Sequence, residues 1–161
     1  MAFDEWVRAK AFHKAFVISA GGILLLTGTA KVWSAFGSAE ILNDVDPLLN
    51  LQFGHLIFAA GALELMVASL CLFSKARQAA TSIVAWLATI LLAYRLSLWW
   101  VGWYRPCSCL GNFTDALHIP QQTADTAMKI ILTYLLIGSY TTLFWLWRQR
   151  KKAVSASASA Q

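Results

Sequence analysis

Four long apolar stretches constrain this chain more than any other feature of its sequence. They contain almost no charged residues, and each is close to the roughly 20 residues that a helix needs to cross the hydrocarbon core of a bilayer. Lipid offers no hydrogen-bond partner to a backbone N–H or C=O group, so such stretches must be helical. The sequence therefore predicts an all-α membrane protein, a four-transmembrane-helix bundle with helices over about residues 15–33, 48–73, 79–104 and 128–147.

The basic residues indicate how this bundle is oriented. Lys and Arg accumulate on the side of a membrane that is not translocated. Four crossings place the N-terminal segment, the connection after the second helix and the C-terminal tail on one side, and these hold most of the 13 basic residues. They are Arg8, Lys10, Lys14, Lys75, Arg77, Arg148, Arg150, Lys151 and Lys152. We therefore predict that both chain ends are cytoplasmic (N-in and C-in). The net charge of +5 then reflects topology, and no nucleic-acid partner is expected.

Little of the chain remains outside the helices, so we expect one transmembrane domain, residues 15–147. Residues 1–14 are expected to form a cytoplasmic or interfacial amphipathic segment. Residues 148–161 are basic and end in alternating Ser and Ala, which predicts a disordered cytoplasmic tail.

Two longer connections join the helices on the outer side. The first, about residues 34–47, is acidic, and Pro47 is suited to begin the second helix. The other, about residues 105–126, is the longest and most polar, and Thr123 or Thr126 is suited to cap the last helix.

Small residues mark the helix faces that are expected to pack, because they let neighbouring backbones approach closely in lipid. On the first two helices they recur at intervals of seven, and on the third they flank Arg95 at seven residues on each side. They are Gly21 and Gly28, then Gly54, Gly61 and Ala68, then Ala88 and Gly102. Lys31 and Glu64 each follow one of these glycines by three residues, and Arg95 lies midway along the third set. We therefore expect all three ionisable side chains to point into the bundle.

Glu64 is the most costly of these residues to place, because an acid within a membrane is usually paired, protonated or functional. Arg95 is the first candidate partner, although the two differ by about 10 Å in expected depth along their helices. The alternative is a protonated Glu64 bonded to a hydroxyl or backbone group. His55 lies on the opposite side of the same helix and should not touch Glu64. Lys31, near the outer end of its helix, can snorkel towards the interface.

The Cys107-Ser108-Cys109 element carries the sharpest chemical signal. The predicted topology places it outside the cytoplasm, where thiols can be oxidised. Cysteines separated by one residue can close only a small, strained ring, and strained disulfides tend to be labile or catalytic. A neighbouring cation, Arg105 or Lys31, would favour the reactive thiolate.

Two other readings of this pair remain open: a structural disulfide, and a metal site. Two thiolates can bind a soft metal, but a zinc site usually needs four ligands and only His118 is near in sequence. We therefore assign no metal ligands. The third cysteine, Cys71, is expected at the opposite end of its helix as a small packing residue.

Together these elements resemble the MauE/DoxX group of small bacterial four-helix membrane proteins, most closely its methylamine utilisation protein MauE branch. Three elements match over about residues 12–148: Gly28-Thr29-Ala30-Lys31, Gly61-Ala62-Leu63-Glu64, and the C-x-C-x-G element Cys107-Ser108-Cys109-Leu110-Gly111. The last is the most specific. The family often has Gly between the cysteines and Phe after them, where this chain has Ser108 and Leu110.

The resemblance implies a multi-pass protein of the bacterial cytoplasmic membrane, with the cysteine loop facing the periplasm or exterior. It also implies a role in maturation or disulfide formation of an exported protein. MauE itself is associated with maturation of the disulfide-rich small subunit of methylamine dehydrogenase.

These observations favour a redox-associated maturation factor, a thiol–disulfide oxidoreductase in which Cys107 and Cys109 react and Lys31, Glu64, Arg95 and Arg105 tune the site. Its partners would be a client protein or a thioredoxin-like carrier, within a lipid bilayer and as a monomer or homo-oligomer. The sequence contains no evident cofactor motif, and a quinone is one candidate electron acceptor. The alternatives are a non-enzymatic scaffold for a redox partner, and a small-solute or metal carrier.

Overall fold

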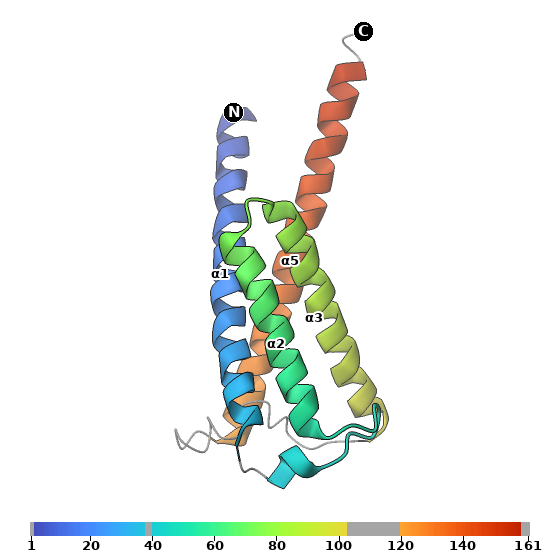
Figure 1. Cartoon of the computed structure of the whole chain (residues 1–161). Coiled ribbons are helices and arrows are strands. Elements are labelled where there is room, and N and C mark those ends of the chain that lie inside the picture. Colours follow the sequence, from blue (N-terminus) through green and yellow to red (C-terminus); the bar gives the residue numbers. More distant parts are fainter. Residues whose placement is uncertain (1, 38–39, 103–119, 159–161) are drawn as a thin grey trace.

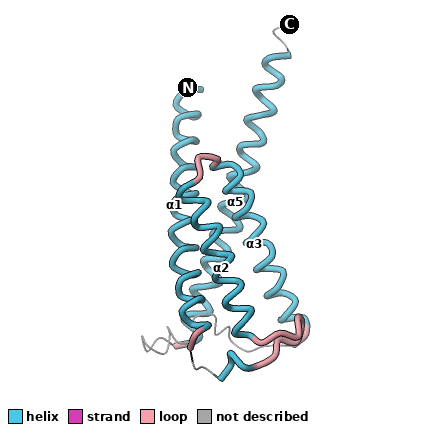
Figure 2. The backbone as a smooth tube through the Cα atoms, in the orientation of Figure 1, coloured by secondary structure: helices cyan, strands magenta, loops and turns pink. Residues whose placement is uncertain are grey.

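A computed structural model describes residues 2–37, 40–102 and 120–158, and this part of the chain is built from helices and loops (Figure 2). Its elements are α1 (Ala2–Ala35), the short 3-10 helix η1 (Glu40–Asn43), α2 (Phe53–Phe73), α3 (Arg77–Trp100) and α5 (Gln121–Ala158). The four long helices pack side by side as a bundle (Figure 1). The described residues contain no strand, and the predicted all-α fold is confirmed.

Each long helix contains a segment that is long and apolar enough to cross a membrane: Ala11–Ala35, Phe53–Phe73, Arg77–Trp100 and Gln122–Lys151. The prediction of a four-helix membrane protein is therefore confirmed. At 1.5 Å per residue, α2 and α3 extend about 32 and 36 Å, close to the roughly 30 Å of a hydrocarbon core. By the same rise α1 and α5 reach about 51 and 57 Å, and so project beyond it.

Both chain termini and the connection between α2 and α3 lie at one end of the bundle, which we call the terminal end (Figure 1). The opposite end, which we call the loop end, carries residues 36–52 and the points where α3 ends and α5 begins. The three basic segments of the sequence therefore share the terminal end.

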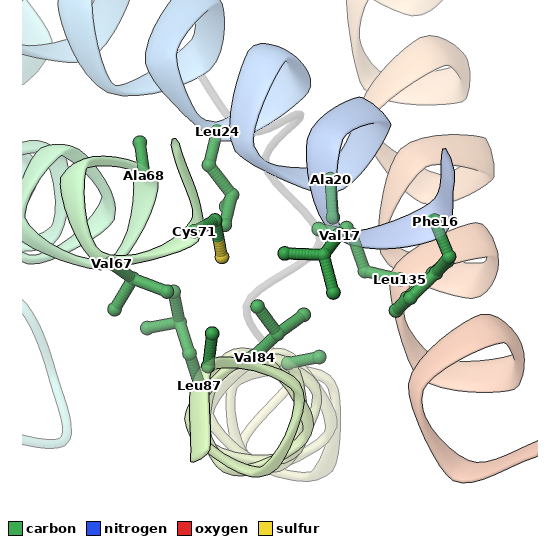
Figure 3. Packing of buried hydrophobic residues seen from close by; sticks show 12 residues of the cluster. Phe16, Val17, Ala20, Leu24, Val67, Ala68, Cys71, Val84, Leu87 and Leu135 are labelled. Carbon is green, nitrogen blue, oxygen red and sulfur yellow. The ribbon is translucent and has the colours of Figure 1, made fainter. Parts of the chain in front are cut away.

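An apolar core joins all four helices (Figure 3). The positions of its residues along the helices place it in the half of the bundle nearer the terminal end. Its members are Phe16, Val17, Ala20, Leu24, Val67, Ala68, Cys71, Ala80, Val84, Leu87, Ala88 and Leu135. Cys71 is a free, buried cysteine within this core, and its expected packing role is confirmed. Lipid provides little hydrophobic driving force between helices, so the fit of these side chains stabilises the bundle mainly through van der Waals contact.

The backbones of α1 and α2, the most extensive helix pair, approach each other closely where the two helices cross. A Cβ atom added at Gly28 would lie 3.0 Å from the carbonyl oxygen of Gly61, and one added at Gly61 would lie 3.0 Å from that of Gly28. About two helical turns away along α1, a Cβ added at Gly21 would lie 3.0 Å from Cβ of Cys71 on α2. The predicted small-residue faces of these two helices therefore do form their contact.

Besides the bonds that involve Lys, Arg or Glu side chains, three side-chain hydrogen bonds between helices supplement this packing. Donors and acceptors that face a neighbouring helix in lipid are usually paired in this way, each bond contributing about 0.6 kcal/mol on average. The bonds are His13–Thr81 at 2.9 Å, Ser19–Tyr134 at 2.7 Å and Thr89–Tyr140 at 2.9 Å.

Several helix boundaries differ from the sequence-based expectation. The second helix begins at Phe53, not near Pro47, because the intervening residues form a tight loop in which Asn50 has a φ of 54°. The third helix ends at Trp100, where Gly102 adopts a φ of 80° that ends regular helix. Thr126 does not cap the last helix, because its hydroxyl bonds the carbonyl of Gln122 inside α5.

The two ends of the chain are also more helical than expected. Residues 2–14 continue directly into α1 and form no separate segment, and residues 148–158 continue α5 where a disordered tail was expected. Arg, Lys, Gln and Ala dominate the start of that extension, and all of them favour helix once a preceding turn exists.

The glycine crossing yields a direct test. Replacing Gly28 or Gly61 with Ala should lower the stability of the purified protein by about 1–3 kcal/mol, because the new methyl group meets a backbone carbonyl that cannot move freely. Thermal unfolding in detergent micelles measures this loss. Gly22→Ala is the matched control, since a Cβ there meets nothing within 4 Å. Equal melting temperatures for the three variants would refute a tight crossing.

Candidate functional site

Lys31 and Glu64 form an ion pair buried between α1 and α2. Lys31 is 4% exposed and Glu64 is 2% exposed. The ammonium of Lys31 donates to Oε1 of Glu64, and the hydroxyl of Thr27 donates to Oε2 at 2.9 Å. Both carboxylate oxygens therefore have a donor, which is the condition for keeping a charged carboxylate inside a low-dielectric environment.

The glycine crossing makes this pair geometrically feasible. A Cβ at Gly61 would lie 3.0 Å from Cβ of Lys31, so the base of the Lys31 side chain passes directly over that glycine. Glu64 follows on the same face of α2, and its Cβ is 3.2 Å from the position a Cβ would take at Gly28. The expectation that Lys31 and Glu64 point inwards is confirmed, whereas snorkelling of Lys31 to the interface is not observed.

A polar stripe on α1 extends from this pair towards the loop end. Thr27, Lys31 and Ser34 are spaced by four and three residues, which places them on one face of the helix. Ser34 is 1% exposed, and its hydroxyl is the buried side-chain polar atom that lacks a hydrogen-bond partner among the described residues.

Arg95 does not pair with Glu64, and that candidate pairing was wrong. Its guanidinium instead donates to Oδ1 of Asp125 at 2.9 Å, joining α3 to α5. Lys129 contacts the other oxygen of Asp125 at 2.6 Å. The reason is depth, because Glu64 lies mid-helix whereas Arg95 lies near the loop end of α3. The Arg95–Asp125 side chains are also less buried, at 23% and 18% exposed.

A second buried carboxylate, Asp46, organises the loop before α2. Its Oδ1 accepts the backbone N–H groups of Leu48 and Leu49, each at 2.8 Å. Its Oδ2 accepts the hydroxyl of Tyr94 on α3. Asp46 is 0% exposed, so it both fixes the turn and attaches the loop to α3. From the sequence, Asp46 is expected only as part of an acidic loop with a turn before the second helix.

Tyr94 and Arg95 together fix the loop end of α3, since one holds the loop before α2 and the other holds the start of α5. The described part of the chain stops here at Gly102 and resumes at Pro120. Three predicted site residues, Cys107, Cys109 and Arg105, lie between these points and outside the described residues. The structure therefore brings Lys31 and Glu64 together but does not bring Arg95 to them.

The described residues contain no group of three or more His, Cys, Asp or Glu side chains arranged to hold a metal ion. His55 is exposed at the start of α2, on a different face from Glu64. His118, the histidine considered as a ligand beside the cysteines, lies outside the described residues.

The buried ion pair yields a second test. Lys31→Met and Glu64→Gln should each destabilise the protein by about 3–5 kcal/mol, because each leaves one buried group without its partner. The double variant should lose less than the sum of the two. Unfolding in detergent, analysed as a double-mutant cycle, measures the coupling.

Arg95→Gln serves as the comparison for this cycle. Its loss should be smaller, because its pair is partly exposed and Asp125 keeps Lys129. Strictly additive losses at Lys31 and Glu64 would show that the two charges are not coupled.

Comparison with known proteins places this arrangement in a family. Searches of the curated proteins and of the solved structures give no match. A family model described as methylamine utilisation protein MauE matches residues 9–153, which include all four membrane spans, the Lys31–Glu64 pair and the cysteine element. Because this match covers most of the chain, the protein belongs to the MauE family.

Proposed function

We propose that this protein is a membrane maturation factor that exchanges disulfides with an exported protein through Cys107 and Cys109. The observation that carries the proposal is the family match, which spans the C-x-C-x-G element within four membrane-spanning helices. The family takes its name from methylamine utilisation, so a client within that process is the first to test.

The proposed reaction is a thiol–disulfide exchange. A thiolate of the client attacks one sulfur of the Cys107–Cys109 disulfide, which releases the other cysteine as a thiolate and forms a mixed disulfide. The second thiolate of the client then attacks the client's sulfur in the mixed disulfide and releases the cysteine of the membrane protein. The products are an oxidised client and a reduced cysteine pair, so two electrons have passed to the membrane protein.

Regeneration of the disulfide releases two electrons and two protons. We propose a membrane quinone as their acceptor, because a quinone takes up two of each and dissolves in the bilayer. A thioredoxin-like carrier could supply oxidising equivalents by the same exchange chemistry.

The fixed loop end supports this role. Tyr94 and Arg95 hold the loop end of α3 against residues 44–52 and against α5. In the sequence the cysteine element lies between α3 and α5, so these contacts restrain the two helix ends that it joins. Lys31 and Glu64 are proposed to act indirectly, by holding α1 and α2 in register beneath the loop end.

We also propose that the loop end faces the periplasm or exterior, in a bacterial cytoplasmic membrane. Three basic segments share the terminal end, and the positive-inside rule assigns such an end to the cytoplasm. The acidic loop that contains Asp44 and Asp46 lies at the opposite end. An oxidising compartment would then surround the cysteine pair.

Redox trapping in intact cells tests the proposal. A Cys71→Ser variant leaves Cys107 and Cys109 as the only thiols in the chain. After equilibration in graded thiol buffers, a membrane-impermeant maleimide should label two thiols from outside under reducing conditions and none under oxidising conditions. We expect a reversible transition with a midpoint above about −300 mV, the range of labile disulfides.

Two results would contradict the proposal in different ways. A pair that never changes state would exclude exchange and favour a non-enzymatic scaffold for a redox partner. Labelling only after permeabilisation would show the opposite orientation. Replacing both cysteines with Ser should abolish maturation of the client while leaving the amount of membrane protein unchanged.

A further inference from the structure

At the terminal end, α5 carries two aromatic and two basic side chains on one exposed face. They are Phe144, Trp147, Arg148 and Lys151, and their spacing of three, four and seven residues aligns them along the helix. All four are exposed in the bundle. Further towards the membrane centre the same face continues with exposed Tyr140 and Ile137.

These side chains are arranged in contact with one another. The rings of Phe144 and Trp147 stack with centroids 5.9 Å apart. The guanidinium carbon of Arg148 lies 5.8 Å from the centroid of Phe144, and Nζ of Lys151 lies 4.0 Å from the ring of Trp147. Each cation is thus held at a ring by a cation–π contact. This contact does not use up the several N–H donors of an Arg or Lys side chain, which can still bind an acceptor.

Among the side chains that the structure describes, no carboxylate is paired with either cation. The sequence contains no Asp or Glu after Asp125, and none between Glu64 and Asp115. The acidic residues of the terminal segments are Asp4 and Glu5, in the first turns of the separate helix α1. An anion from outside the protein is therefore the natural partner of Arg148 and Lys151.

The depth of the face in the membrane identifies that anion. Arg150, beside the two cations, donates to the side chain of Gln78 in the first turn of α3. The cations are therefore level with the end of the bundle, where a span ends and headgroups begin. Each ring lies one turn deeper than the cation that contacts it, in the interfacial zone where aromatic residues concentrate.

We propose that this face of α5 is a binding site for an anionic phospholipid of the leaflet at the terminal end. Oxygens of the lipid phosphate accept hydrogen bonds from Arg148 and Lys151, and an acyl chain lies along Phe144, Trp147 and Ile137. A lipid fits better than an acidic protein, because half of the face consists of rings on the least covered of the four spans. The site is independent of the cysteine chemistry.

Native mass spectrometry of the full-length protein in detergent tests the site, with phosphatidylglycerol and phosphatidylcholine of equal chain length as probes. Wild-type protein should bind phosphatidylglycerol preferentially. Arg148→Gln/Lys151→Gln should weaken that binding by about thirtyfold, from roughly one kcal/mol per basic residue near a headgroup. The matched control is Lys75→Gln/Arg150→Gln, which removes two cations from the same end but off this face, and it should change binding by less than about threefold.

Three outcomes would overturn the site. They are equal binding of the two lipids by wild-type protein, equal losses in the two double variants, and complete displacement of phosphatidylglycerol by inorganic phosphate. Equal binding of the two lipids would show that the face makes only ordinary contact with the membrane. Equal losses would show that the cations attract lipid only by diffuse electrostatics. Displacement by phosphate would show that the rings contribute nothing to binding. If melting shows that the double variant does not fold, Arg148→Gln and Lys151→Gln are measured singly, each with an expected loss of about fivefold.

Discussion

The buried contact between Lys31 and Glu64 is the interaction on which the rest of the structure depends. Two charges within a membrane are tolerated only when they neutralise each other, and this pair can meet only where two helix backbones nearly touch. Gly28 and Gly61 provide that approach, and Thr27 satisfies the remaining carboxylate oxygen. The cost of separating the charges therefore fixes both the register and the rotation of α1 against α2.

Further polar contacts attach the other helices to this unit, one of them buried at Asp46 and one partly exposed at Arg95. Asp46 links the loop before α2 to Tyr94 on α3, and Arg95 links α3 to Asp125 on α5. Both contacts lie at the loop end, near the end of α3 and the start of α5, the two helices that precede and follow Cys107 and Cys109 in the sequence. A rigid pair of helices, with two further helix ends attached to it, is an arrangement suited to presenting a short reactive segment at a membrane surface.

Much of this could be predicted from the sequence, because the bilayer imposes a strong physical constraint. Apolar stretches of membrane-spanning length gave the four helices, and seven-residue spacing of small residues identified the faces of α1 and α2 that pack. The inward direction of Lys31 and Glu64 followed from their position relative to those glycines. Their pairing did not follow, because sequence spacing gives the rotation of a residue on its helix but not which neighbouring helix it faces.

The remaining differences have similar causes. The role of Asp46 depends on the hydroxyl of Tyr94 on α3. No local sequence pattern predicts such a contact between distant segments. Asp125 was expected in the loop of residues 105–126, because a threonine was taken as the start of the last helix. The structure places Asp125 inside α5, which begins directly after Pro120. The tail after Trp147 was expected to be disordered from its Ser and Ala content, yet helix once begun propagates through such residues at little cost.

The most direct test of the central claim is to trap the mixed disulfide between this protein and its client. In variants with a single cysteine, Cys107→Ser and Cys109→Ser in a Cys71→Ser background, the remaining thiolate attacks a disulfide of the oxidised client and releases one client thiolate, which is the reverse of the last step of the exchange. The mixed disulfide then accumulates, because the membrane protein has no second cysteine that could displace the client. Non-reducing electrophoresis of quenched cells followed by mass spectrometry should show a reductant-sensitive adduct with an exported protein for at least one variant, and none when both cysteines are replaced. The absence of any such adduct from both single-cysteine variants, in cells where the client is being matured, would contradict disulfide exchange as the function of this membrane protein.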